Sequence, residues 1–88
     1  MGSITHLGKK WFDKEINLKE FANKFGKVLE IDRDNIATVW KGRILWIHCS
    51  WGEDITKCIK AKFYLCDPAS HEVDEDELWE ELEKALGV

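Results

Sequence analysis

Basic side chains lie next to tryptophans at two points of this sequence. Lys41 and Arg43 follow Trp40. Lys9 and Lys10 come directly before Trp11. Cations neutralise phosphate groups and aromatic rings stack on bases, so this combination is typical of a surface that binds nucleic acid. The residues that we predict to bind nucleic acid are Lys9, Lys10, Trp11, Trp40, Lys41, Arg43, Leu45 and Trp51.

The cysteines do not form a pattern that is typical of a metal site. Zinc sites need closely spaced pairs such as C-x2-C, because one turn must deliver two thiolates. Cys49, Cys58 and Cys66 are irregularly spaced and odd in number, which indicates reduced thiols and an intracellular location, in the cytoplasm or nucleus. No nucleophile motif or glycine-rich phosphate loop is present. We therefore predict a protein with no metal, no cofactor and no enzymatic activity.

Charge is unevenly divided along the 88 residues, a length that fits one small domain. Residues 1–62 carry 12 Lys/Arg and eight Asp/Glu, a net +4, whereas residues 63–88 carry one Lys and nine Asp/Glu, a net −8. A basic body with an acidic tail favours a polyanionic partner; the alternative is that both charge runs only solvate the surface. No apolar run reaches the roughly 18–20 residues of a membrane span, so no membrane partner is expected.

The spacing of apolar residues predicts a first helix after Asn17. Asn17 is a good N-cap, and Glu20 completes a capping box. Gly26 is expected to end the helix in the left-handed conformation. The predicted buried stripe is Leu18, Phe21, Ala22 and Phe25.

Two strands and a second helix are predicted next. The strand over residues 28–32 turns Leu29 and Ile31 inward, and residues 33–38 form a polar loop. The strand over residues 41–49 places Ile44 and Trp46 in the core, which leaves Arg43 and Leu45 on the exposed face. Residues 53–61 are predicted to be helical, and residues 63–66 form the last strand. The inner stripe of this helix is Ile55, Cys58, Ile59 and Lys62. The whole predicted core is Phe21, Phe25, Leu29, Ile31, Ile44, Trp46 and Ile59.

A third, acidic helix is predicted over residues 75–86. Asp74 with Glu77 forms a capping box, and Val73 with Leu78 forms a hydrophobic staple. Its apolar stripe needs a cover, and the open face of the sheet is the nearest large apolar surface. We expect the helix to mask part of that face or to contact a partner. The candidate partner-binding residues are Leu78, Trp79, Leu82 and Leu86.

The predicted order helix–strand–strand–helix–strand matches the βαββαβ pattern except for its first strand. Two stretches could form that first strand, residues 4–7 or residues 10–12. The stretch FANKFGKV and the Lys41-Gly42 start of the next apolar strand resemble an RNA recognition motif (RRM). GKVLEID and the following Gly-Arg-Ile-Leu are similar to the RRM-like domain of plant retroelement Gag-like proteins. The resemblance implies an α+β split βαβ sandwich, an RRM-like domain over residues 4–66, whose sheet binds RNA. Residues 1–3 resemble a cloning scar, and residues 67–88 are expected to be a linker and the acidic helix.

Two functions follow as expectations. The first is a non-catalytic module that binds RNA, preferably single-stranded, or a nucleoprotein, through the sheet face and flanking basic residues. The second is a protein-interaction module, for a peptide or for a second copy of the chain, because Leu45 stands where RRM proteins carry a stacking aromatic residue.

Overall fold

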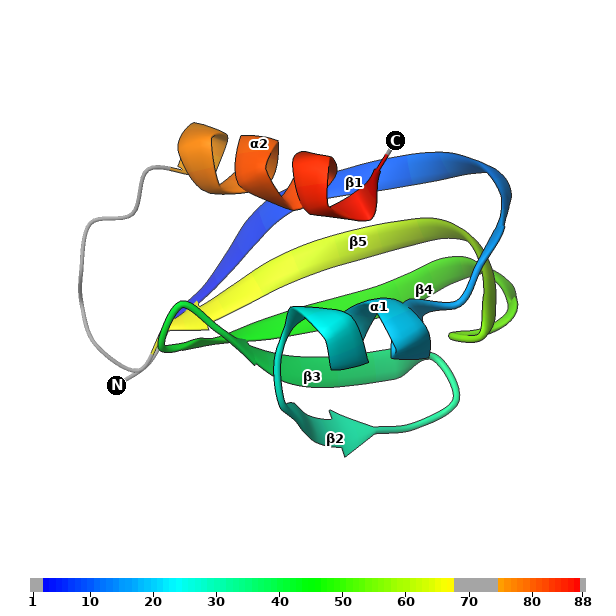
Figure 1. Cartoon of the computed structure of the whole chain (residues 1–88), viewed down its shortest axis with the longest axis horizontal. Coiled ribbons are helices and arrows are strands. Elements are labelled where there is room, and N and C mark those ends of the chain that lie inside the picture. The colour runs from blue at the N-terminus through cyan, green and yellow to red at the C-terminus, as the bar shows by residue number, and fades with distance from the viewer. Residues whose placement is uncertain (1–2, 68–74, 88) are drawn as a thin grey trace.

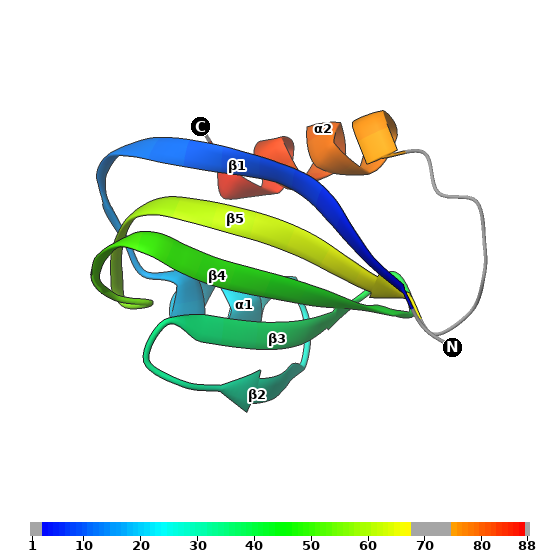
Figure 2. The ribbon, with the colours of Figure 1, turned by 180° about the vertical axis from the view of Figure 1, so that it is seen from behind.

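The computed structural model of this chain describes residues 3–67 and 75–87. The strands form one antiparallel sheet in the order β1-β5-β4-β3-β2, and both described helices lie on the same face of it (Figure 1). Figure 2 shows the opposite face, which no described helix covers; we call it the open face. The elements are β1 (Ser3–Ile16), α1 (Leu18–Phe25), β2 (Val28–Ile31), β3 (Asn35–Trp40), β4 (Arg43–Asp54), β5 (Lys57–Asp67) and α2 (Glu75–Leu86).

The predicted split βαβ sandwich is wrong, because the region expected to be a second helix is a β-hairpin. Asp54 ends β4, and its Oδ1 accepts a hydrogen bond from the backbone N–H of Thr56 (2.8 Å), which closes a tight turn before β5. β5 then pairs with β4 on one side and with β1 on the other. Both alternatives for the first strand lie within β1, and much of the predicted polar loop over residues 33–38 belongs to β3.

The first helix is confirmed from its N-cap at Asn17 to its C-cap at Gly26, but the conformation of that glycine differs from the predicted one. Asn17 Oδ1 accepts hydrogen bonds from the backbone N–H groups of Lys19 (3.0 Å) and Glu20 (3.2 Å). Gly26 is not left-handed, since its φ of −173° is extended. A Cβ at Gly26 would collide with the carbonyl oxygen of Val39, so the close approach of two backbones explains this glycine. Of the predicted stripe, the fully buried members are Leu18 and Ala22 and the partly buried ones are Phe21 and Phe25.

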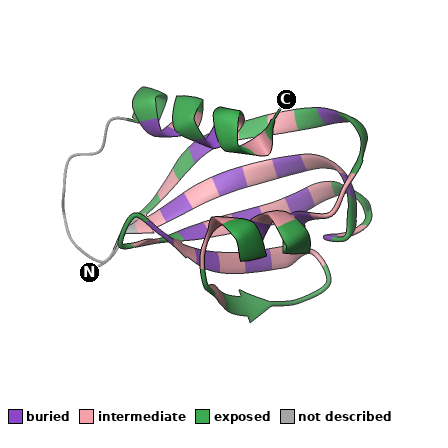
Figure 3. Ribbon diagram, viewed as in Figure 1, coloured by how far each residue is buried: buried purple, intermediate pink, exposed green. Residues whose placement is uncertain are grey.

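The face of β4 that forms the core is the opposite of the predicted one. Leu45 and Ile47 are fully buried beneath the helices, whereas Ile44 is 37% exposed and Trp46 lies half-buried on the open face. Both faces of β4 are apolar, so alternation alone did not select one, and a shift by one residue exchanges them. Figure 3 shows the resulting alternation of buried and partly buried residues along β4 and β5. The predicted core residues Leu29 and Ile31 are also exposed.

The acidic helix is confirmed as α2, but it packs on the face that α1 also covers and leaves the open face uncovered. Leu78 and Leu82 are buried in the core, and Leu86 packs against it. The Trp79 ring contacts Phe63, with 5.5 Å between the ring centroids. These candidate partner-binding residues therefore contact the protein's own core. The predicted staple and cap residues, Val73 and Asp74, lie outside the described residues.

No helix in the described part of the chain is long and apolar enough to cross a membrane.

Cys49 and Cys58 form a disulfide between β4 and β5, with their Cα atoms 5.9 Å apart. This corrects the prediction that all three cysteines are reduced, which rested on their spacing. The two residues meet because β4 and β5 pair at this end of the hairpin. Cys66 is a free thiol, and its partial burial raises its pKa.

Gly8 allows α2 to approach β1. A Cβ at this position would lie 2.7 Å from the Trp79 ring, too close for van der Waals contact. We expect Gly8→Ala to lower the free energy of unfolding by about 1–3 kcal/mol, since the indole must shift to avoid a clash. Urea denaturation measures this loss. In a Trp79→Leu background the same substitution should cost less, and an equal cost in both backgrounds would contradict the explanation.

Candidate nucleic-acid interface

The open face consists of rows of side chains that cross the sheet from strand to strand. Ladder partners share a face, so the pairing of the strands defines each row. The apolar row is Ile4, Cys66, Ile44 and Val39. The aromatic row is His6, Tyr64, Trp46, Ala37 and Glu30. The lysine row is Lys9, Lys62, His48 and Asn35. Beyond it, Lys60 pairs with Trp11 on β1 and Trp51 on β4.

Three of the predicted nucleic-acid-binding residues belong to these rows or pair with them. Lys9 is exposed and pairs with Lys62. Trp11 is 58% exposed, and the Lys60 Nζ lies 4.9 Å from the centroid of its ring. Trp51 is 62% exposed. The structure thus places two accessible indoles on either side of one lysine, an arrangement that leaves ring surface available for stacking.

The other predicted residues lie away from the open face. Leu45 is fully buried, and Trp40 is buried against Phe25, with ring centroids 5.1 Å apart. Arg43 is the ladder partner of Trp40, so it shares the helix-covered face. The two lysines bind α2: Lys10 forms an ion pair with Glu83 at 2.8 Å, and Lys41, in the β3–β4 turn, forms one with Glu81.

Most of the open face was missed by the sequence-based prediction, although the signal was present. Lys60, Lys62 and Tyr64 alternate with buried residues at period two, which is typical of a half-buried strand. The spacing of Ile55, Cys58 and Ile59 instead favours a helix, which places Lys60 behind the sheet and Lys62 at the edge of the helix's inner stripe. Trp46 was missed because the predicted face of β4 was inverted.

The aromatic row is held by ring contacts and hydrogen bonds. The Trp46 and Tyr64 rings meet nearly edge to face, at 61° with centroids 4.9 Å apart, and the Tyr64 and His6 centroids are 5.1 Å apart. Asn35 Oδ1 accepts a hydrogen bond from Trp46 Nε1 (3.0 Å) and lies 2.8 Å from His48 Nδ1. These contacts restrict the Trp46 indole to one orientation, so little side-chain entropy remains to be lost when it stacks on a ligand.

Asp32 fixes Asn35 in turn. Its Oδ1 accepts hydrogen bonds from the backbone N–H of Asp34 (2.9 Å) and from Asn35 Nδ2 (3.2 Å). The hydrogen bond from the Asp34 backbone N–H, followed by that from the Asn35 side chain, holds the pKa of Asp32 below its ordinary value. Asp32 therefore stays ionised at neutral pH, and the carboxyl groups of Asp32 and Glu30 form an anionic border opposite the lysines of β1 and β5.

No family model, curated protein or solved structure matches this chain. Within residues 3–67 and 75–87, no group of three or more His, Cys, Asp and Glu side chains is placed to hold a metal ion. The chemistry of the open face is that of a rigid aromatic row flanked by lysines.

Proposed function

We propose that this protein binds single-stranded RNA across the open face of its sheet. The observation that carries the proposal is the alternation of the aromatic row with the lysine row and with the Trp11–Lys60–Trp51 group on the open face, which no described helix covers. Bases stack on aromatic side chains, and lysines neutralise phosphates. Successive rows on one face of a sheet are about 7 Å apart, which is comparable with the phosphate spacing of an extended single strand.

The open face combines aromatic rings and lysines, as expected of an RRM-like sheet, but it belongs to a sheet with a different topology. The RNA-stacking positions that the resemblance placed at Arg43 and Leu45 are replaced by Trp46 on the same strand and Tyr64 on β5. The protein is proposed to act as a binding module without catalysis or cofactor. The intracellular location expected from three reduced thiols loses that support, since Cys49 and Cys58 are paired.

A charge-matched pair of triple variants tests the proposal. The first variant combines Lys9→Gln, Lys60→Gln and Lys62→Gln. It should reduce the slope of the logarithm of the binding constant against the logarithm of the salt concentration by about 2, because each phosphate contact on a single strand contributes about 0.7. The control, Lys19→Gln, Lys24→Gln and Lys27→Gln, removes the same charge from exposed lysines on and after α1. Fluorescence anisotropy with single-stranded RNA, single-stranded DNA and duplex RNA measures both. Equal salt slopes for the two variants would contradict the proposal.

A second candidate is self-association or peptide binding through the apolar row, the protein-interaction function that the sequence also favoured. Ile4 is 65% exposed and Ile44 37% exposed, and both pair with Cys66. Exposed apolar groups that lie together favour contact with another protein surface. Sedimentation velocity of wild type and of Ile4→Ser/Ile44→Ser decides this candidate, because a dimer formed through this row should dissociate in the variant.

A further inference from the structure

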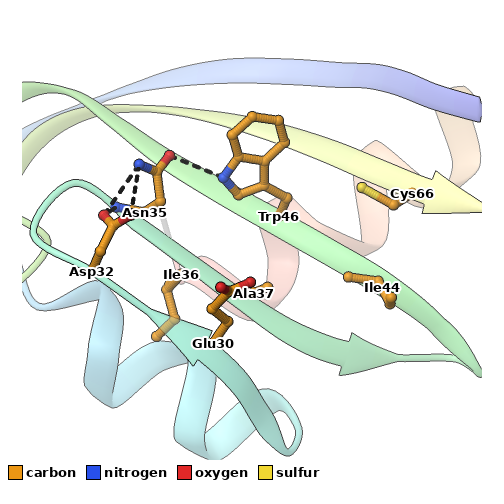
Figure 4. Close-up of a pocket in the computed structure, with 8 residues that line it drawn as sticks. All are labelled: Glu30, Asp32, Asn35, Ile36, Ala37, Ile44, Trp46 and Cys66. Carbon is orange, nitrogen blue, oxygen red and sulfur yellow. Dashed lines mark hydrogen bonds between the residues drawn. The ribbon is translucent and has the colours of Figure 1, made fainter.

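The open face contains a pocket of about 340 Å³ next to Trp46 (Figure 4). It is lined by side chains from β2, β3, β4 and β5 and by Asp32. Its volume lies within the 300–1,000 Å³ that is usual for sites of small organic groups. The pocket exists because Ala37 separates Trp46 from Glu30 in the aromatic row, and its single methyl group leaves the space between them unfilled.

The polar groups of the pocket differ in whether they are already engaged. Asn35 uses its oxygen on Trp46 and its nitrogen on Asp32, and Asp32 also accepts backbone hydrogen bonds. Glu30 is exposed, and its carboxylate makes no hydrogen bond or ion pair with any residue of the described part of the chain. In Figure 4 this carboxylate lies beside Ala37, in the pocket. Both carboxylate oxygens of Glu30 are therefore available to a ligand, whereas Asp32 Oδ1 already accepts three hydrogen bonds.

A free carboxylate discriminates among the four bases. Its two oxygens accept two parallel N–H groups, a geometry that gives strong, directional bonds. Guanine carries such a pair, N1–H and the N2 amino group, on its Watson–Crick edge. Adenine and cytosine present one amino group beside a ring nitrogen that repels a carboxylate, and uracil presents one N–H between two carbonyl oxygens. Glu30 is thus matched to guanine.

The charges of the open face are arranged to hold a whole nucleotide. Lys62 and Glu30 lie on strands three spacings apart, about 14 Å between backbones. A nucleotide and two extended side chains span that distance, with the phosphate toward Lys62 and the base edge toward Glu30. The reverse orientation of the nucleotide would place its phosphate beside the carboxylates of Glu30 and Asp32.

We infer that this pocket selects one guanine within a bound single strand, and this inference rests on the proposed binding of RNA. The base stacks on Trp46, whose plane Asn35 fixes. Glu30 accepts hydrogen bonds from guanine N1–H and N2–H, and the lysine row contacts the adjoining phosphate.

Changes of one base in a short RNA test the inference, including one that removes a single amino group. The probes are labelled heptamers UUUXUUU with X as guanosine, inosine, adenosine or uridine, measured by fluorescence anisotropy. Inosine lacks only the 2-amino group of guanosine. We expect the guanosine heptamer to bind about 10-fold more tightly than the inosine heptamer, in line with the discrimination that a bidentate contact provides.

Glu30→Gln tests the role of the carboxylate, with Glu20→Gln on α1 as a control that removes the same charge from another exposed site. Glu30→Gln should abolish the preference for guanosine over inosine, and Glu20→Gln should preserve it. Equal affinity of the wild type for guanosine and inosine, or a preference that survives Glu30→Gln, would overturn the inference and leave the proposed function standing. Absence of binding to every heptamer would overturn both.

Discussion

Leu45→Ala should lower the free energy of unfolding by about 2–5 kcal/mol, whereas Ile44→Ala should lower it by less than about 1 kcal/mol. Leu45 is fully buried between the sheet and the helices, so its truncation leaves a cavity. Ile44 is 37% exposed on the open face and has solvent on one side. The two residues are adjacent on β4 and have the same number of carbon atoms, which makes Ile44 a matched control.

Urea denaturation followed by tryptophan fluorescence and circular dichroism measures both variants. The experiment also distinguishes the two possible faces of β4. The sequence pattern predicts Ile44 and Trp46 in the core, whereas the structure places Leu45 there. A larger loss for Ile44→Ala than for Leu45→Ala would show that the strand has the opposite register.

Replacing both Leu78 and Leu82 with Ala should lower the free energy of unfolding by about 4–8 kcal/mol, comparable with the whole stability of a small domain. Leu82 is fully buried and Leu78 is 9% exposed, and both pack in the same core as β1 and β5. Glu80→Ala is the control on the exposed side of α2 and should change stability by no more than about 0.5 kcal/mol. A double variant as stable as the control would show that α2 does not belong to the folded unit.

The position of α2 also has a consequence for binding. The sequence favoured a helix that masks the ligand face, so that its loss would raise RNA affinity. Because α2 lies on the opposite side of the sheet, we expect the Leu78→Ala/Leu82→Ala variant, refolded with a stabilising osmolyte, to bind RNA with unchanged affinity per folded molecule. A clear rise in affinity would restore the masking hypothesis.

The two helices could be placed from the sequence because their signals are local. Asn17 caps α1 through N–H groups two and three residues away, and the stripes of both helices depend on residues one turn apart. A period of 3.6 residues with an apolar stripe has few alternatives once a cap precedes it. Two of the residues that the sequence predicts to contact nucleic acid, Lys9 and Trp11, do lie on the open face, and their binding of a ligand stays a prediction.

Only the tertiary structure decided which face each strand presents and whether residues 53–61 form a helix or a hairpin. β4 is apolar on both faces, so its orientation depends on α1 and α2, which pack on one side only. The stretch from Cys58 to Lys62 satisfies helical and strand periodicity alike. It becomes a strand because β1, more than 40 residues earlier in the chain, pairs with its outer edge. Such pairing between distant segments is invisible to a local pattern, and here it determines where Lys60, Lys62, Trp46 and Glu30 meet.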